Sequence, residues 1–127
     1  MTTIQARNDG LLRFALKLDG VASGGLGVIA LLFHDDLPTG LPGGLVIGLS
    51  VFLVLYGIGV FLLGLRPVRS LVAVVVIANA LWVLDSLLVA FAGWFPVTGL
   101  GVALIVAQAV AVTGFLILQV LGLRRSA

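Results

Sequence analysis

The fold of this chain is decided by residues 70–91, SLVAVVVIANALWVLDSLLVAF. The segment is long enough to cross a bilayer, because about 20 apolar residues span the roughly 30 Å hydrocarbon core. It nevertheless contains Asn79, Trp82, Asp85 and Ser86. A carboxylate at mid-membrane costs about 2.5 to 3.5 kcal/mol on insertion scales, so such groups are expected to face protein or water. The segment therefore predicts a membrane-spanning helix with a polar face turned toward other helices.

The composition places the whole chain in the membrane class. Of its 127 residues 61% are hydrophobic, and the mean hydropathy is +1.32, far above the range of soluble domains. Cysteine is absent, which excludes disulfides, thiolate metal sites and thiol redox chemistry. The single histidine, His34, is too few for a bis-His haem, and no metal site is expected.

The sequence contains four apolar segments separated by short turns. Residues 34–44, HDDLPTGLPGG, cannot continue a helix because of their prolines and glycines. A signal peptide is the alternative interpretation of residues 1–30, but the apolar run is too long and contains Asp19. We therefore predict an all-α fold, a transmembrane up-down-up-down four-helix bundle. The predicted parts are an N-terminal tail (1–10), helices at about 11–33, 41–65, 68–92 and 97–123, and a C-terminal tail (124–127).

The basic residues all fall on one side of this arrangement. They are Arg7, Arg13, Lys17, Arg66, Arg69, Arg124 and Arg125. By the positive-inside rule, both tails are predicted to be cytoplasmic in a multi-pass protein of a cell inner membrane. Because these residues flank apolar segments and do not cover a soluble face, no nucleic-acid partner is expected despite the net charge of +2.

Helical periodicity places the intramembrane polar residues on stripes. In the third segment Asn79, Trp82 and Ser86 lie within about 60° of one another, whereas Asp85 lies about 95° from the middle of that stripe. At about 1.5 Å per residue, Asn79 and Gln108 are expected at one depth, near the midplane. Further inward stripes are expected at Asp19 and Ser23, at Phe52 and Tyr56, and at Gln108, Phe115 and Gln119.

A purely structural role is the alternative for many of these residues. Ser, Asn and Gln often join membrane helices at about 0.6 kcal/mol per hydrogen bond, and the pairs Gly20/Gly24 and Gly44/Gly48 suit helix contacts that need no ligand. Asp19 and Asp85 point more strongly to function, because carboxylates inside a membrane are expensive and usually mark proton, ion or ligand sites.

Four short stretches carry a resemblance to known proteins. They are LDGVASGGLG (18–27), LPGGL (41–45), NALWVLDS (79–86) and LQVLGLRR (118–125). Together they loosely resemble small bacterial integral membrane proteins of the DoxX-like four-helix group. The resemblance implies four helices, suggests a link to quinone-dependent redox membranes, and matches no catalytic motif. It directs attention to Asp19, Ser23, Asn79, Trp82, Gln108 and Gln119.

The leading functional hypothesis is a lipid-embedded protein whose polar interior binds a lipophilic small molecule, such as a quinone, a prenyl chain or another lipid. Asn79 and Gln108 would hydrogen-bond a carbonyl or hydroxyl group of the ligand, with Trp82 and Tyr56 packed beside it. Ser23 and Gln119 complete the candidate ligand-binding set.

Two further hypotheses come from other functional classes. As an enzyme, the protein would be a membrane isomerase or cyclase in which Asp19 and Asp85 donate and accept a proton. As a structural or accessory subunit, it would pack its glycine faces against a second copy or a larger membrane complex.

Overall fold

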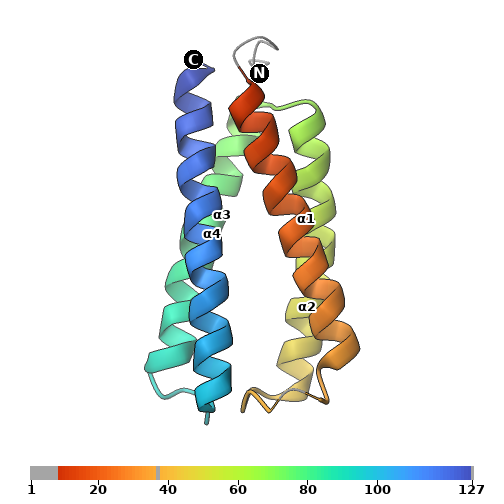
Figure 1. The fold of residues 1–127 in the computed structure, drawn as a ribbon, viewed down its shortest axis with the longest axis vertical. Coiled ribbons are helices and arrows are strands. Elements are labelled where there is room, and N and C mark those ends of the chain that lie inside the picture. The colour runs from red at the N-terminus through yellow and green to blue at the C-terminus, as the bar shows by residue number, and fades with distance from the viewer. Residues whose placement is uncertain (1–8, 37, 127) are drawn as a thin grey trace.

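The computed structural model describes residues 9–36 and 38–126 and contains four helices (Figure 1). These are α1 (Gly10–Phe33), α2 (Gly43–Leu65), α3 (Arg69–Phe91) and α4 (Gly99–Arg125). The predicted helix ranges differ from these by at most two residues at any end. Most of the predicted N-terminal tail (1–10) lies outside the described residues.

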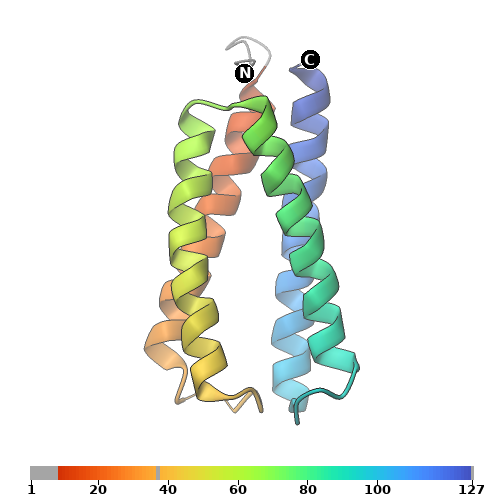
Figure 2. The same ribbon diagram turned by 180° about the vertical axis from the view of Figure 1, so that it is seen from behind.

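The helices alternate in direction, so α1 begins and α4 ends at the same end of the bundle (Figures 1 and 2). We call this the terminal end, and the opposite end, with the connections 34–42 and 92–98, the loop end. α1 packs against α2 and α4, and α3 packs against α4, whereas α2 and α3 scarcely touch. The predicted all-α, up-down-up-down four-helix bundle is confirmed.

Each helix is long and apolar enough to cross a membrane, with mean hydropathies between 1.6 and 2.6. The outer surface carries many exposed large apolar side chains, among them Phe14, Leu32, Leu55, Val74 and Phe91. Such a surface is stable against acyl chains and unstable against water. The chain is therefore a small multi-pass integral membrane protein.

α1 and α2 approach closely because glycines face each other. A Cβ at Gly20 would lie 2.7 Å from the Gly57 carbonyl oxygen, and one at Gly57 would lie 2.5 Å from the Gly24 backbone nitrogen. Small residues at such positions are the usual means of bringing membrane helices into contact. A Cβ at Gly44 or Gly48 would meet nothing within 4 Å, so only one of the two predicted glycine pairs forms such a contact.

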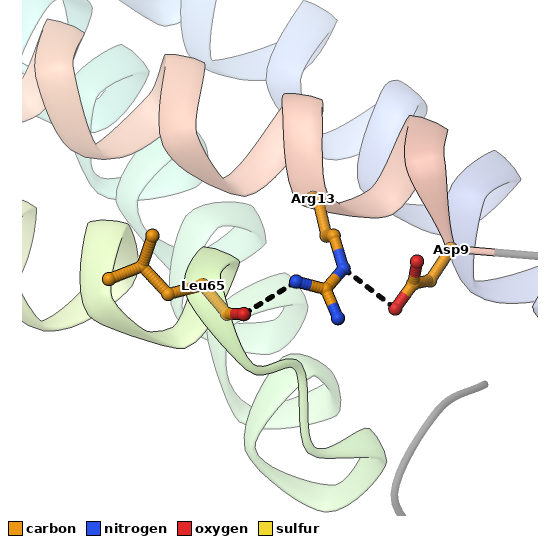
Figure 3. Close-up of polar contacts among 3 residues, drawn as sticks. All are labelled: Asp9, Arg13 and Leu65. Carbon is orange, nitrogen blue, oxygen red and sulfur yellow. Dashed lines mark hydrogen bonds and ion pairs between the residues drawn. The ribbon is translucent and has the colours of Figure 1, made fainter. Parts of the chain in front are cut away.

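The terminal end is closed by an apolar core with a polar clamp above it. The core contains Leu12, Leu16, Val60, Val72 and Val75. The clamp is Arg13, whose Nε donates to Asp9 Oδ2 (2.8 Å) and whose Nη1 donates to the Leu65 carbonyl oxygen (2.5 Å) (Figure 3). It ties the beginning of α1 to the end of α2.

The loop end is closed by contacts between the two outer connections. Thr98 N donates to the Thr39 carbonyl oxygen (2.9 Å), and Thr98 Oγ1 donates to the Pro38 carbonyl oxygen (2.5 Å). Gly40 has φ +84, and a Cβ there would overlap the Pro96 carbonyl oxygen, so glycine is needed for both the turn and the contact. The connection between α1 and α2 is thus joined to the connection between α3 and α4.

The glycine contact between α1 and α2 gives the first prediction. Gly57→Ala is expected to lower the free energy of unfolding by about 1 to 3 kcal/mol, because the added Cβ overlaps the backbone of α1. Denaturant unfolding in detergent micelles, followed by circular dichroism, measures the change. Gly59→Ala is the matched control, because its Cβ would meet nothing within 4 Å, and it is expected to cause no loss. Equal stability of the two variants would contradict the close approach of these helices.

Candidate functional site

Asp19 is the centre of a buried hydrogen-bond network. Its side chain is 0% exposed, about 14 Å along α1 from the terminal end at 1.5 Å per residue. Oδ1 accepts a hydrogen bond from Ser23 Oγ (2.9 Å), and Oδ2 accepts from Asn79 Nδ2 (2.9 Å) and Gln119 Nε2 (2.8 Å). The carboxylate is therefore held by three neutral donors from three helices.

The network continues to α2 through Asn79. Tyr56 Oη donates to Asn79 Oδ1 (2.9 Å), and Asn79 Nδ2 also donates to Gln119 Oε1 (2.9 Å). We call these five residues, Asp19, Ser23, Tyr56, Asn79 and Gln119, the Asp19 network. Because it takes side chains from all four helices, it fixes their relative rotation and depth.

Apolar side chains cover the Asp19 network on the side of the terminal end. Leu16 lies about one helical turn from Asp19 along α1, on the side of the terminal end, and Val75 lies about one turn from Asn79 along α3 on the same side. Val60 in α2 and Leu123 in α4 likewise lie about one turn from Tyr56 and Gln119 toward the terminal end. These side chains separate the network from the terminal end of the bundle.

A second polar layer lies one turn of α3 closer to the loop end. Trp82 Nε1 donates to Gln108 Oε1 (2.7 Å), and Gln108 Nε2 donates to Ser86 Oγ (2.9 Å) and to the Ile105 carbonyl oxygen (2.8 Å). Ser86 Oγ in turn donates to the Trp82 carbonyl oxygen (2.7 Å). We call Trp82, Ser86 and Gln108 the Trp82 layer.

The two polar layers border a cavity of about 170 Å³, which we call the inner cavity. Ser23, Tyr56 and Asn79 line it from the Asp19 network, and Trp82 and Gln108 line it from the Trp82 layer. Leu26, Leu53 and Val112 are among its apolar walls. A space with a few polar groups in apolar walls is the usual form of a small-molecule site.

Aromatic rings form one side of the inner cavity. The Phe52 ring stacks on Tyr56, with centroids 5.5 Å apart and planes 22° apart, and on Trp82, at 6.1 Å and 18°. These three rings and Phe115 all line the space. The rings of α2 and α3 therefore meet in the region where the two helices themselves scarcely touch.

A second space of about 270 Å³, the outer cavity, extends toward the loop end. Its walls are mostly apolar and include Ile29, Val46, Leu49 and Leu104. Leu26, Leu53, Trp82 and Gln108 line both cavities, so the hydrogen bond between Trp82 and Gln108 lies at their common boundary.

Most of the residues expected to face a shared interior do so. Asp19, Ser23, Tyr56, Asn79, Trp82, Gln108 and Gln119 all belong to the two polar layers. Asn79 and Gln108 were expected at one depth but belong to different layers, because Gln108 bonds to Trp82 and Asn79 bonds to Asp19 and Gln119. The two amides face the inner cavity from opposite layers.

The structure does not bring Asp85 into this interior. Its side chain is exposed on the outside of α3, as its angle of about 95° from the stripe of Asn79 and Trp82 explains. Asp19 lies behind Ser23 and Asn79 and is absent from the lining of the inner cavity. Neither candidate catalytic carboxylate therefore borders that space.

Two aromatic residues of the lining were not among the sequence-predicted site residues. They are Phe52 and Phe115, which precede Tyr56 by four residues and follow Gln108 by seven. That spacing puts each on the same helix face as a predicted site residue and is the signal that identifies them.

No known protein family, curated protein or solved structure matches this chain.

The Asp19 network gives the second prediction. Gln119→Leu is expected to lower the free energy of unfolding by about 1 to 3 kcal/mol, because it removes one donor from the buried carboxylate and one acceptor from Asn79. Chemical unfolding in micelles measures the loss. Thr113→Val is the matched control on α4, because among the described residues the Thr113 hydroxyl bonds to the Ala109 carbonyl oxygen of its own helix and to no other helix. It should change stability by less than about 0.5 kcal/mol. Similar losses in both variants would contradict a network that links helices.

Proposed function

We propose that this protein binds a lipophilic small molecule, with a polar head in the inner cavity and an apolar part in the outer cavity. The observation that carries the proposal is the inner cavity itself. Protein cores are close-packed and have few internal spaces larger than a water molecule, so a space of about 170 Å³ among these side chains is unusual. A ligand that fills it would gain contacts with the surrounding side chains.

The size of the inner cavity supports a ring-sized head group. An engineered apolar cavity of about 150 Å³ in another protein accommodates one benzene molecule. The inner cavity, at about 170 Å³, has comparable room, and the stacked rings of Phe52, Tyr56 and Trp82 offer flat surfaces. A quinone, a prenyl compound or another lipid with a compact head is the class that we propose.

The lining residues have distinct roles in this proposal. Ser23, Tyr56, Asn79 and Gln108 supply polar contacts, and Trp82 packs beside the head group at the boundary of the two cavities. Gln119 lies behind Asn79 in the Asp19 network and acts by holding it in place. The apolar outer cavity receives the chain of the ligand.

We further propose that the protein lies in a cell inner membrane, with its terminal end facing the cytoplasm. The described basic residues support this. Arg13 and Lys17 lie in the terminal half of α1, Arg66 follows the last residue of α2, Arg69 begins α3, and Arg124 and Arg125 end α4. In this orientation the inner cavity lies near the membrane centre, and the outer cavity lies between it and the outer surface.

A cavity-filling substitution tests the proposed function. Ala78→Phe places a large ring in the inner cavity, which Ala78 lines, and is expected to abolish retention of lipid-sized molecules. Native mass spectrometry of gently extracted protein measures the bound mass.

Ala80→Phe is the matched control for this experiment. Ala80 is exposed on the same helix, two residues away and on its opposite face, so this variant should keep the adducts of the wild type. Wild-type protein that carries no adduct, or adducts that persist in Ala78→Phe, would refute ligand binding in the inner cavity.

A further inference from the structure

We infer that the inner cavity selects a hydrogen-bond-donating cation, the ammonium group of a lipophilic amine, over a carbonyl compound such as a quinone. This inference rests on the proposed function and narrows its ligand class. The inference follows from the hydrogen-bond donors and acceptors that the polar side chains of the inner cavity still have free for a ligand.

Every polar proton of the lining side chains is already donated. The hydroxyl of Ser23 donates to Asp19, and that of Tyr56 donates to Asn79. The amide of Asn79 donates to Asp19 and Gln119, and the indole N–H of Trp82 donates to Gln108. Both amide protons of Gln108 go to the Ser86 hydroxyl and the Ile105 carbonyl oxygen.

The direction of these hydrogen bonds is fixed by two groups, one that can only accept a hydrogen bond and one that can only donate. A carboxylate only accepts, so the amide nitrogens of Asn79 and Gln119 must face Asp19. An indole N–H only donates, so the amide oxygen of Gln108 must face Trp82. Backbone N–H groups within the helices are committed to the helical hydrogen bonds and add no free donor.

What remains for a ligand is lone pairs. Among the described residues, no donor is directed at the oxygens of Ser23 or Tyr56, and the amide oxygens of Asn79 and Gln108 each accept one bond from a side chain. An sp² oxygen has room for a second bond. A ligand carbonyl would find no donor here and would bury its oxygen unsatisfied, whereas an ammonium or hydroxyl group would find acceptors.

The charge of the neighbouring carboxylate favours the ammonium over the hydroxyl. The hydrogen bonds to Asp19 come from Ser23, Asn79 and Gln119, all neutral, and within residues 9–36 and 38–126 no cationic side chain is paired with it. A buried anion without a counter-ion is costly in an apolar medium. A cation in the inner cavity would be separated from it by one side chain, Ser23 or Asn79.

The aromatic rings support the same ligand class. Lys, Arg and ligand cations are attracted to the faces of Trp, Tyr and Phe within about 6 Å of the ring centroid. Phe52, Tyr56, Trp82 and Phe115 all line this space of about 170 Å³. The mostly apolar walls of the outer cavity suit an alkyl or other hydrocarbon chain attached to the amine.

Three chain-matched probes test the inference on the wild-type protein. Decylamine, decanol and methyl octyl ketone are offered as an equimolar mixture to the full chain in a non-ionic detergent, and their adducts are compared by native mass spectrometry. We expect the decylammonium adduct to exceed the ketone adduct by about tenfold or more, with the alcohol between them. Ala78→Phe, with its filled cavity, gives the level of non-specific adduct.

The outcomes separate this inference from the proposed function. A ketone adduct equal to or larger than the ammonium adduct would overturn the choice of a cation while leaving the cavity as a lipid site. Adducts of all three probes at the level of Ala78→Phe would refute the proposed function as well.

A pair of carboxylate variants tests the part played by Asp19. Asp19→Asn should reduce the ammonium-to-ketone ratio at least threefold, whereas Asp36→Asn, which removes an exposed carboxylate of the loop end, should preserve it. Circular dichroism checks that each variant is folded. The comparison of the three probes on the wild-type protein does not depend on these variants. An unchanged ratio in folded Asp19→Asn would contradict selection by this charge.

Discussion

The structure depends on one constraint, the need to satisfy a carboxylate inside an apolar bundle. Asp19 is fully buried, so its hydrogen-bond donors come from other side chains. Ser23, Asn79 and Gln119 supply them at 2.8 to 2.9 Å, and Tyr56 extends the same network to the remaining helix. Leaving a buried polar group without partners costs about 1 to 3 kcal/mol, and more when it is charged. The rotation of each helix is therefore tied to one point.

The inner cavity follows from how the four helices meet around that point. Glycines let α1 and α2 pack backbone to backbone, whereas α2 and α3 scarcely touch and are bridged by long side chains. Tyr56 reaches Asn79 by its hydroxyl, and Phe52 reaches Trp82 by ring stacking. Rigid rings and amides held by hydrogen bonds cannot collapse into the remaining space as flexible aliphatic chains do. A bundle closed at both ends thus retains space in its interior.

The sequence predicted the four spans because length and hydropathy suffice to define a membrane helix. It also predicted the inward stripe of Asn79 and Trp82, because helical periodicity depends only on residue spacing. It could not predict the partners across helices. Asn79 and Gln108 were expected at one depth, and their separation depends on the relative shift of α3 and α4, which side-chain packing sets. Asp85 was a candidate site residue and is exposed instead. Helical periodicity gives its angle on α3 but does not show which faces of α3 the neighbouring helices cover.

A density map of the protein in a lipid nanodisc, at a resolution that separates side chains, measures the central interaction directly. We predict that the amides of Asn79 and Gln119 lie within about 3 Å of the Asp19 carboxylate. We also predict density that is not protein in the inner cavity, beside Asn79, Trp82 and Gln108. A carboxylate of Asp19 turned toward the acyl chains, with the amides paired elsewhere, would contradict this description of how the bundle is held together.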